Sequence, residues 1–255
     1  MRGGSMLEAE IAEKSYGSGA GGRRMVLRDI GFAAGTGEVI AILGASGVGK
    51  TTLLRILVGL DRDFNGVLRG PTGPVGVIFQ EPRLLPWQSV ADNIRLVRSR
   101  EMPEPDVPAL LAEAELPGVG AHMPAELSGG MAQRVAFARA LAVKPRTIIA
   151  DEPFASLDPG VAAMLATCLT ERARRMGTLI LFSTHNVDLA VSVASRVIVL
   201  SGSPATLVAD LAVPEGGSVG IREQLEAGYG FLNGQVDSFK TDARFREGMH
   251  RGSQS

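Results

Sequence analysis

The sequence predicts an α/β fold built on a mostly parallel sheet, for three reasons. Short apolar runs of strand length alternate with helical segments, as in sheets that are covered by helices. The run Val39 to Leu43 ends in a glycine loop and leads into a helix predicted for Lys50 to Val58, which Gly59 closes. Between Glu81 and Pro145 the chain is rich in Ala, Leu and Glu and broken by prolines, which predicts short helices inserted between core strands.

The other buried strands are predicted from apolar runs that lead into polar or turn-forming residues. These runs are Val75 to Phe79, Thr147 to Ala150, Thr178 to Ser183 and Arg196 to Leu200. After Pro214 the chain is Gly-rich and polar, and at most one helix is expected there, near Ile221 to Ala227.

Net charge, cysteine count and the length of apolar runs exclude several classes of protein. The 255 residues carry 26 Lys and Arg against 27 Asp and Glu, a net charge of −1, which gives no support for nucleic-acid binding. Cys168 is the single cysteine, so an internal disulfide and zinc sites with two thiolates are excluded, and a reducing cytoplasm is expected. No apolar run approaches the roughly 18 residues of a membrane span. The start, M-R-G-G-S, lacks the apolar stretch of a signal peptide, and two interpretations stay open: these residues are native, or they precede a natural start at Met6.

A phosphate-binding loop is the strongest single motif. The stretch G-A-S-G-V-G-K-T follows a predicted strand and fits G-x-x-x-x-G-K-S/T, whose glycines let backbone N–H groups converge on phosphate. Lys50 is expected to reach the β- and γ-phosphates, and the Thr51 hydroxyl to bind Mg²⁺. The predicted phosphate-binding residues are Gly44, Ala45, Ser46, Gly47, Val48, Gly49, Lys50, Thr51 and Thr52.

Two acids follow the apolar run T-I-I-A. Asp151 is therefore predicted at the carboxyl end of a buried strand, where ligands of open α/β sheets gather. It is expected to hold Mg²⁺ directly or through water, and Glu152 to orient and deprotonate an attacking water. Two acids after a strand more often begin a helix, but the metal of a phosphate loop needs a carboxylate partner.

A second phosphate-binding element is predicted in L-S-G-G-M-A-Q-R. Ser128 would cap a helix, and Gly129 and Gly130 would leave the N–H groups of its first turn open. Simple capping and phosphate binding are compatible there. Two different phosphate-holding elements on one chain suggest a nucleotide clamped between two copies.

From about Tyr16 to Leu211 the chain resembles the ATP-binding subunits of ABC transporters. Besides the motifs above, it carries F-Q-E-P at Phe79 to Pro82, F-A-S-L-D at Phe154 to Asp158 and S-T-H at Ser183 to His185, in the order of that family. The resemblance implies an ABC-type phosphate-loop ATPase with an N-terminal antiparallel β part. It also implies an ATPase domain over residues 6–213, with a helical subdomain at about 88–144, and an extension of unknown role over 214–255.

The resemblance implies further roles for single residues. Gln80 would touch Mg²⁺ and the attacking water, and report the nucleotide state to a membrane subunit. Ser128 to Gly130 would contact the γ-phosphate held by the opposite copy, and Asp158 would bridge the two copies. His185 would hold the γ-phosphate and Glu152 in place, and Tyr16 would stack on adenine.

The implied assembly is a head-to-tail homodimer that forms with ATP. Membrane-spanning permease subunits would be its direct partners and a solute-binding protein an indirect one, with the chain on the cytoplasmic face of the membrane. The segments F-Q-E-P-R-L-L-P-W, L-S-G-G-M and V-L-S-G-S-P resemble the importers for nitrate, sulfonates and taurine. Two departures are Asn186 and Leu189, where members of the family often carry acids, and a third is the short hairpin Asn65 to Gly76.

Other interpretations remain at this level. A soluble ABC-type ATPase of DNA repair or translation is an alternative, but only 77 positions separate Lys50 from Leu127, too few for a long coiled coil. A phosphate-loop kinase or GTPase would have no use for L-S-G-G-M-A-Q-R. Cys168 lies on an apolar helix stripe and is expected to pack in the core, whereas Trp87 suits the core and a docking surface equally.

Overall fold

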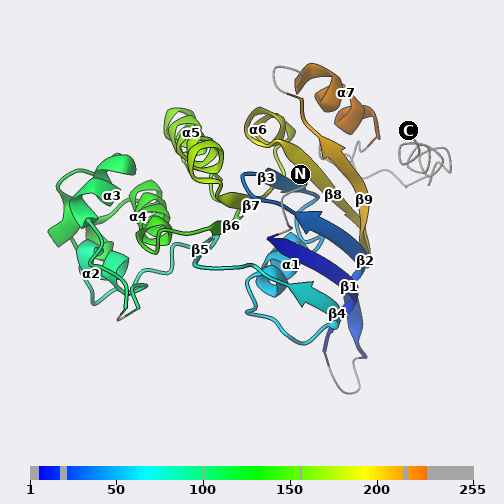
Figure 1. Ribbon diagram of the computed structural model, residues 1–255, viewed down its shortest axis with the longest axis horizontal. Helices are drawn as coiled ribbons and strands as arrows, with labels where there is room; N and C mark the ends of the chain where they lie inside the picture. Colours follow the sequence, from blue (N-terminus) through cyan, green and yellow to red (C-terminus); the bar gives the residue numbers. More distant parts are fainter. Residues whose placement is uncertain (1–5, 18–21, 100, 156, 215–217, 229–255) are drawn as a thin grey trace.

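The computed structural model describes residues 6–17, 22–99, 101–155, 157–214 and 218–228. Within these ranges the strands form one mixed sheet in the order β4-β1-β2-β9-β8-β3-β7-β6-β5 (Figure 1). In chain order they are β1 (Leu7–Tyr16), β2 (Arg24–Ala34), β3 (Val39–Leu43), β4 (Asn65–Arg69), β5 (Val75–Ile78), β6 (Thr147–Asp151), β7 (Leu179–Thr184), β8 (Arg196–Gly202) and β9 (Ala205–Ala212).

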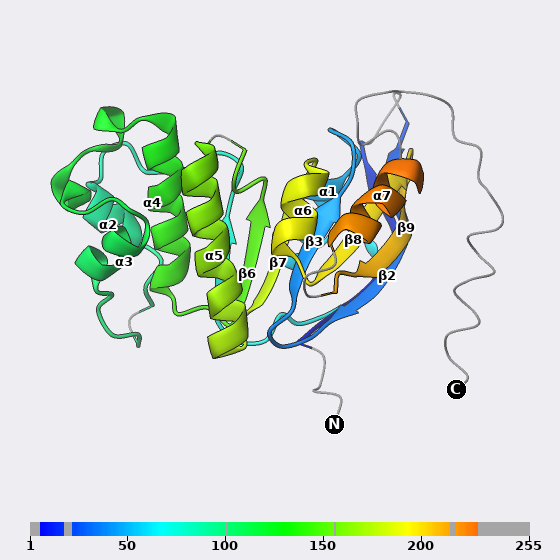
Figure 2. The ribbon, with the colours of Figure 1, turned by 90° about the horizontal axis from the view of Figure 1, so that it is seen from above.

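Helices cover both faces of this sheet. They are α1 (Lys50–Leu57), α2 (Val90–Arg95), α3 (Val107–Glu113), α4 (Gly129–Ala142), α5 (Pro159–Met176), α6 (Val187–Val193) and α7 (Ser218–Gly228). Figure 1 shows α5, α6 and α7 on one face and α1 on the other. The chain leaves the sheet after β5 and returns at β6, and α2, α3 and α4 between them lie together at one end of the molecule (Figures 1 and 2).

The centre of the sheet is parallel and its N-terminal part is antiparallel, which confirms the predicted fold class. β3 pairs in parallel with β7 and β8, and β6 pairs in parallel with β7 and β5. β1 is antiparallel to β2 and β4. The residues of β3, β6 and β7 are all buried, as expected for parallel strands that are covered on both faces.

Element boundaries differ slightly from those expected. The helix predicted for Lys50 to Val58 ends at Leu57 because Val58 is its C-cap, and Gly59 follows with a left-handed φ of 74°. The strand predicted for Thr178 to Ser183 is displaced by one residue. The sequence did not predict β9, which turns back antiparallel to β8 and also bridges to β2.

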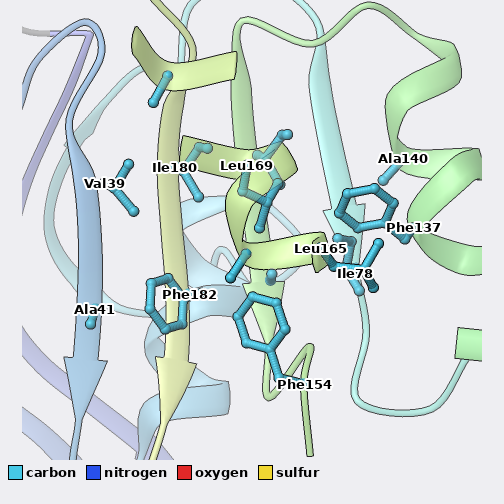
Figure 3. Packing of buried hydrophobic residues seen from close by; sticks show 14 of the residues in the cluster. Val39, Ala41, Ile78, Phe137, Ala140, Phe154, Leu165, Leu169, Ile180 and Phe182 are labelled. Atoms are coloured by element: carbon cyan, nitrogen blue, oxygen red, sulfur yellow. The ribbon is translucent and has the colours of Figure 1, made fainter. Parts of the chain in front are cut away.

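Alternating side chains of the central strands feed two cores. On one face Val39, Ala41 and Leu43 pack with residues from α4, α5 and α6, whereas Ile40 and Ile42 face the buried side of α1. Figure 3 shows the first core around Phe182 of β7, whose ring meets that of Phe154 edge to face, with centroids 5.8 Å apart. The two cores fix the central strands from both sides.

Cys168 has a polar environment that the apolar stripe did not suggest. Its thiol donates a hydrogen bond to the Glu113 carboxylate at 3.0 Å, and Arg172 binds both oxygens of that carboxylate at 2.8 Å. Burial and the neighbouring carboxylate raise the pKa of the thiol to about 12. Cys168 therefore packs against the core, as expected, and its thiol in addition helps to join α5 to α3.

The helix near the end of the described chain is α7, close to where one was expected. Leu225 is buried in the core, and Arg222 forms an ion pair with Asp188 of α6 at 2.9 Å. This helix therefore packs against α6, which begins two residues after His185.

Removing the buried ring of Phe182 is expected to cause a large loss of stability. Phe182→Ala is expected to lower the free energy of unfolding by about 3–5 kcal/mol, because Phe182 is fully buried and the site cannot collapse around the cavity. Val67→Ala on the exposed edge strand β4 is the control and should change stability by about 0.5 kcal/mol or less. Denaturant unfolding of both variants tests this, and a Phe182→Ala loss no larger than the control would contradict it.

The environment of Cys168 predicts slow alkylation. A pKa of about 12 against the ordinary 9 lowers the thiolate fraction at pH 8 by about a thousandfold. Iodoacetamide labelling of the folded chain, followed by mass spectrometry, should be slower by about that factor than labelling of the same thiol in urea. Equal rates in the two states would show that the thiol is not held in its protonated form.

Candidate nucleotide-binding site

The loop between β3 and α1 is closed on itself by Lys50. Its ammonium is buried and donates hydrogen bonds to the carbonyl oxygens of Gly44 at 2.7 Å and Ala45 at 3.2 Å. Two glycines adopt conformations that L side chains rarely reach, with φ of 75° at Gly47 and 126° at Gly49. The loop thus wraps around the N-terminus of α1, where backbone N–H groups and the helix dipole favour an anion.

The glycines of this loop are required for close packing. A Cβ on Gly44 would lie 2.9 Å from the carbonyl oxygen of Leu200, and one on Gly49 would lie 2.8 Å from the Leu27 side chain. A Cβ on Gly47 would meet nothing within 4 Å, so this residue faces open space. The loop is therefore packed tightly at its base and open on its outer side.

A cleft of about 820 Å³ lies beside the loop, a size that suits a small-molecule ligand. Its lining comes from five parts of the fold, namely Tyr16 at the end of β1, Arg24 to Val26 of β2, Ala45 to Thr52 of the loop and α1, Gln80, Asp151 and Glu152 at the ends of β5 and β6, and Ser201 to Ser203 at the end of β8. The predicted loop residues from Ala45 to Thr52 thus share one cleft with Tyr16, Gln80, Asp151 and Glu152.

Ser183 organises the two acids at the end of β6. Asp151 pairs with Ser183 of β7 in the sheet register, and the Ser183 hydroxyl donates to the Asp151 carboxylate at 2.6 Å. The same hydroxyl oxygen accepts the backbone N–H of Glu152 at 2.9 Å. Sequence reasoning gave Ser183 no role of its own, although a fully buried serine at the end of an apolar strand is a recognisable signal.

The carboxylate of Glu152 lies between the ammonium of Lys50 and the imidazole of His185. Its Oε1 is 3.5 Å from the Lys50 ammonium and 3.2 Å from Nδ1 of His185. The backbone of Glu152 has a φ of 46°, an uncommon conformation for a non-glycine residue that is found preferentially at functional sites. The end of β6 therefore turns so that the carboxylate points back toward the loop.

The Gln80 loop is held by the helix that follows L-S-G-G. Arg139 of α4 donates to the carbonyl oxygens of Pro82 at 2.6 Å and Arg83 at 2.9 Å, and Gln133 of the same helix donates to that of Phe79 at 3.3 Å. Burial lowers the pKa of Arg139, although a guanidinium stays charged in proteins. Gln80 is thus connected to α4 through the backbone on both sides of it.

The donor set beside Lys50 suits Mg²⁺. A small hollow of about 160 Å³ is lined by Thr51, Gln80 and Asp151, which offer hydroxyl, amide and carboxylate oxygens. Mg²⁺ takes oxygen ligands and is typically held by one or two carboxylates together with phosphates of a substrate. Within the described ranges, no group of three or more His, Cys, Asp or Glu side chains is arranged to hold a metal ion by itself.

Gly44 and His185 do not line the cleft themselves but adjoin it at Ala45 and Glu152, whereas four other predicted site residues lie away from it. Ser128 caps α4, where its Oγ accepts the N–H of Met131 at 3.2 Å, and Gly129 and Gly130 are the first residues of that helix. Asp158 precedes α5 and is exposed. None of the four is among the described residues that line the cleft of the same chain.

The helical end of the molecule carries exposed apolar side chains. Trp87 is 70% exposed and Leu96 is 56% exposed, so the alternative prediction that Trp87 packs in the core is wrong.

A bilayer-spanning helix needs about 20 mostly apolar residues. Among the helices of the described residues, none provides such a stretch.

Comparison with known proteins places this site in a family. The sequence pattern of the family described as "ABC transporter" matches residues 27–155. The aliphatic sulfonates import ATP-binding protein SsuB 2 of Burkholderia cenocepacia (strain HI2424) is 43% identical over 207 residues, which cover 78% of this chain and 75% of the relative. SsuB 1 of Xanthomonas axonopodis pv. citri (strain 306), with the same description, is 41% identical over 216 residues, covering 80% and 84%.

Solved structures agree with the sequence matches. The dimeric structure of MJ0796, a bacterial ABC transporter cassette, has a TM-score of 0.75 and 26% identity, and the match covers 82% of this chain and 99% of that one. A dimeric post-hydrolysis state of the same cassette, bound to ADP and Pi, matches equally well at 25% identity. The chain therefore belongs to the ABC transporter family, as one of its ATP-hydrolysing cassettes.

Proposed function

We propose that this cassette powers the import of a small anionic or zwitterionic solute, with aliphatic sulfonates first among the candidates. The observation that carries its ATPase chemistry is the Glu152 carboxylate, held between Lys50 and His185 at the rim of the phosphate-loop cleft. The sulfonate assignment is supported by the names of the relatives from Burkholderia and Xanthomonas. Nitrate and taurine are the other solutes that the sequence motifs favour.

The roles of the cleft residues follow from their chemistry. Lys50 and the N–H groups of the loop bind the β- and γ-phosphates, and Glu152 accepts the proton of the attacking water. His185 keeps the Glu152 carboxylate in place through their 3.2 Å contact and reaches the γ-phosphate. Gln80 positions the water, and Mg²⁺, held by Thr51, Gln80 and Asp151, would neutralise charge on the phosphates.

Ser128, Gly129 and Gly130 act on the nucleotide of a second copy. The N-terminus of α4 lies outside the cleft of its own chain, and the phosphate loop is open on its outer side at Gly47, where a partner could reach the nucleotide. A head-to-tail dimer brings this N-terminus and Asp158 to the partner's cleft. Dimeric relatives of known structure support this arrangement.

The exposed helical end is the proposed docking surface for permease subunits. Trp87, Leu96 and Val97 expose apolar side chains there, which is unusual for a surface that meets only water. The dimer would then lie on the cytoplasmic face of the membrane, and the permease would link it to a solute-binding protein. Residues 6–213 form the ATPase domain in this proposal, with 88–144 as its helical subdomain and 214–255 as an extension.

The soluble alternative in DNA repair or translation is set aside. The relatives of highest identity named above are import proteins, and the family pattern is that of transporters. A co-purifying permease is expected when the chain is isolated together with its membrane partners.

Neutralising Glu152 is expected to stop hydrolysis and to trap the dimer. Glu152→Gln should lower kcat by a factor of at least about 100, because the proton acceptor of the attacking water is lost. With saturating ATP and Mg²⁺ the variant should elute as a dimer in size-exclusion chromatography, because the closed pair is not reopened. Glu115→Gln, an exposed glutamate of the helical end, is the control and should hydrolyse ATP at the wild-type rate. Wild-type turnover by Glu152→Gln, or a monomer with ATP, would overturn the assignment.

Removing the Ser183 hydroxyl should slow catalysis without weakening ATP binding. Ser183→Ala deletes the hydrogen bonds to Asp151 and to the N–H of Glu152, so kcat should fall about tenfold. The KM for ATP should stay within about twofold, because Lys50 and the loop are untouched. Ser192→Ala, at an exposed position of α6, is the matched control. A parallel loss of kcat and affinity would indicate a collapse of the strand end instead.

A further inference from the structure

The Tyr16 ring is fixed by two charged neighbours. Its phenolic O–H donates a hydrogen bond to Oδ2 of Asp61 at 2.8 Å, and the Lys14 ammonium lies 4.4 Å from the centroid of the ring. Lys14 also donates to Oδ1 of the same Asp61 carboxylate at 2.8 Å. One carboxylate therefore holds both the hydroxyl of the ring and the cation on its face.

The side chains of Lys14 and Asp61 are largely shielded from solvent, and neither of them lines the cleft. Lys14 is only 1% exposed. A buried ammonium without a partner would be costly, and the Asp61 carboxylate supplies that partner. Burial lowers the pKa of Lys14, but the hydrogen bond and charge of Asp61 outweigh it and leave that pKa above its usual value. Burial likewise raises the pKa of Asp61, and hydrogen bonds from Lys14 and Tyr16 outweigh it, so this pKa is lowered. Both groups are thus charged at neutral pH.

Asp61 belongs to the segment that leaves the phosphate-loop helix. The N–H of Asp61 donates to the carbonyl oxygen of Arg55 at 3.1 Å, in the last turn of α1. The same helix begins at Lys50, beside the phosphate loop. One short helix therefore connects the phosphate loop, at its first residue, with the support of the Tyr16 ring, just beyond its last.

We propose that Asp61 and Lys14 are positioning residues that set the Tyr16 ring as a platform for the base of ATP. Tyr16 is 40% exposed and lines the cleft, while the ammonium of Lys14 occupies one face of the ring. In this proposal the nucleotide base stacks on the opposite face of the ring. The helix α1 fixes the distance between that ring and the phosphate loop. This inference rests on the proposed stacking of the base on Tyr16.

The test separates the ring from its support. Tyr16→Phe keeps the ring and removes only the hydrogen bond to Asp61, and Asp61→Ala removes the acceptor. Each should raise the KM for ATP about fivefold and leave kcat within about twofold, and the double variant should be no worse than either single one. Inhibition by inorganic tripolyphosphate, which has no base, should be unchanged in all three.

A matched control and a second variant make the outcomes distinct. Asp63→Ala should leave the KM unchanged, because it removes only a solvent-exposed carboxylate 3.6 Å from Lys14 and keeps the backbone carbonyl oxygen of residue 63, to which Lys14 donates. Tyr16→Ala removes the platform and should raise the KM more than Tyr16→Phe does. If Tyr16→Ala has no effect, the stacking role itself is wrong. If Tyr16→Ala raises the KM but Tyr16→Phe does not, or if the two single effects add, the positioning role is wrong. Should Asp61→Ala fail to fold, Tyr16→Phe alone decides.

Discussion

The parallel register of β3, β7 and β6 is the constraint on which the site depends. Leu43 pairs with Thr184, and Asp151 pairs with Ser183, so the three strands end at one edge of the sheet. The phosphate loop, the two acids and His185 follow those ends directly, and they meet because the register brings them together. Two apolar cores clamp the strands from both faces, which explains why polar groups can be placed at this edge with little freedom to move.

Each buried polar group at the edge is held by a defined partner. Lys50 is satisfied by carbonyl oxygens of its own loop, Asp151 by the Ser183 hydroxyl, and the loop of Gln80 by the Arg139 guanidinium. The same principle holds at the Tyr16 end of the cleft, where Asp61 balances the buried Lys14. These pairs make the site rigid before a ligand arrives, and preorganised charge of this kind is the main source of catalysis in phosphoryl transfer.

Much of this arrangement can be predicted from sequence, and the same physical reasons explain which parts of it cannot. The central strands are continuous apolar runs, and the glycines of the phosphate loop have a spacing that few other structures need. Both can therefore be recognised from a short stretch of sequence. The strand β9 cannot be recognised in this way, because its sequence lacks a clear alternation and its pairing is set by β8. Ser183 and Lys14 were missed because their partners lie 32 and 47 residues away along the chain. Assembly with a second copy was expected, because two phosphate-binding elements, Gly44 to Thr51 and Leu127 to Arg134, occur on one chain.

The central claim is that each site is shared by two copies of the chain, and mixing two inactive variants tests it most directly. Lys50→Ala disables a cleft, and Ser128→Arg disables the surface offered to the partner's cleft. In a mixed dimer one site carries both changes and the other carries neither. An equal mixture should therefore recover about a quarter of wild-type hydrolysis, since half of the dimers are mixed and each has one intact site of two. No gain over the separate variants would contradict the shared site.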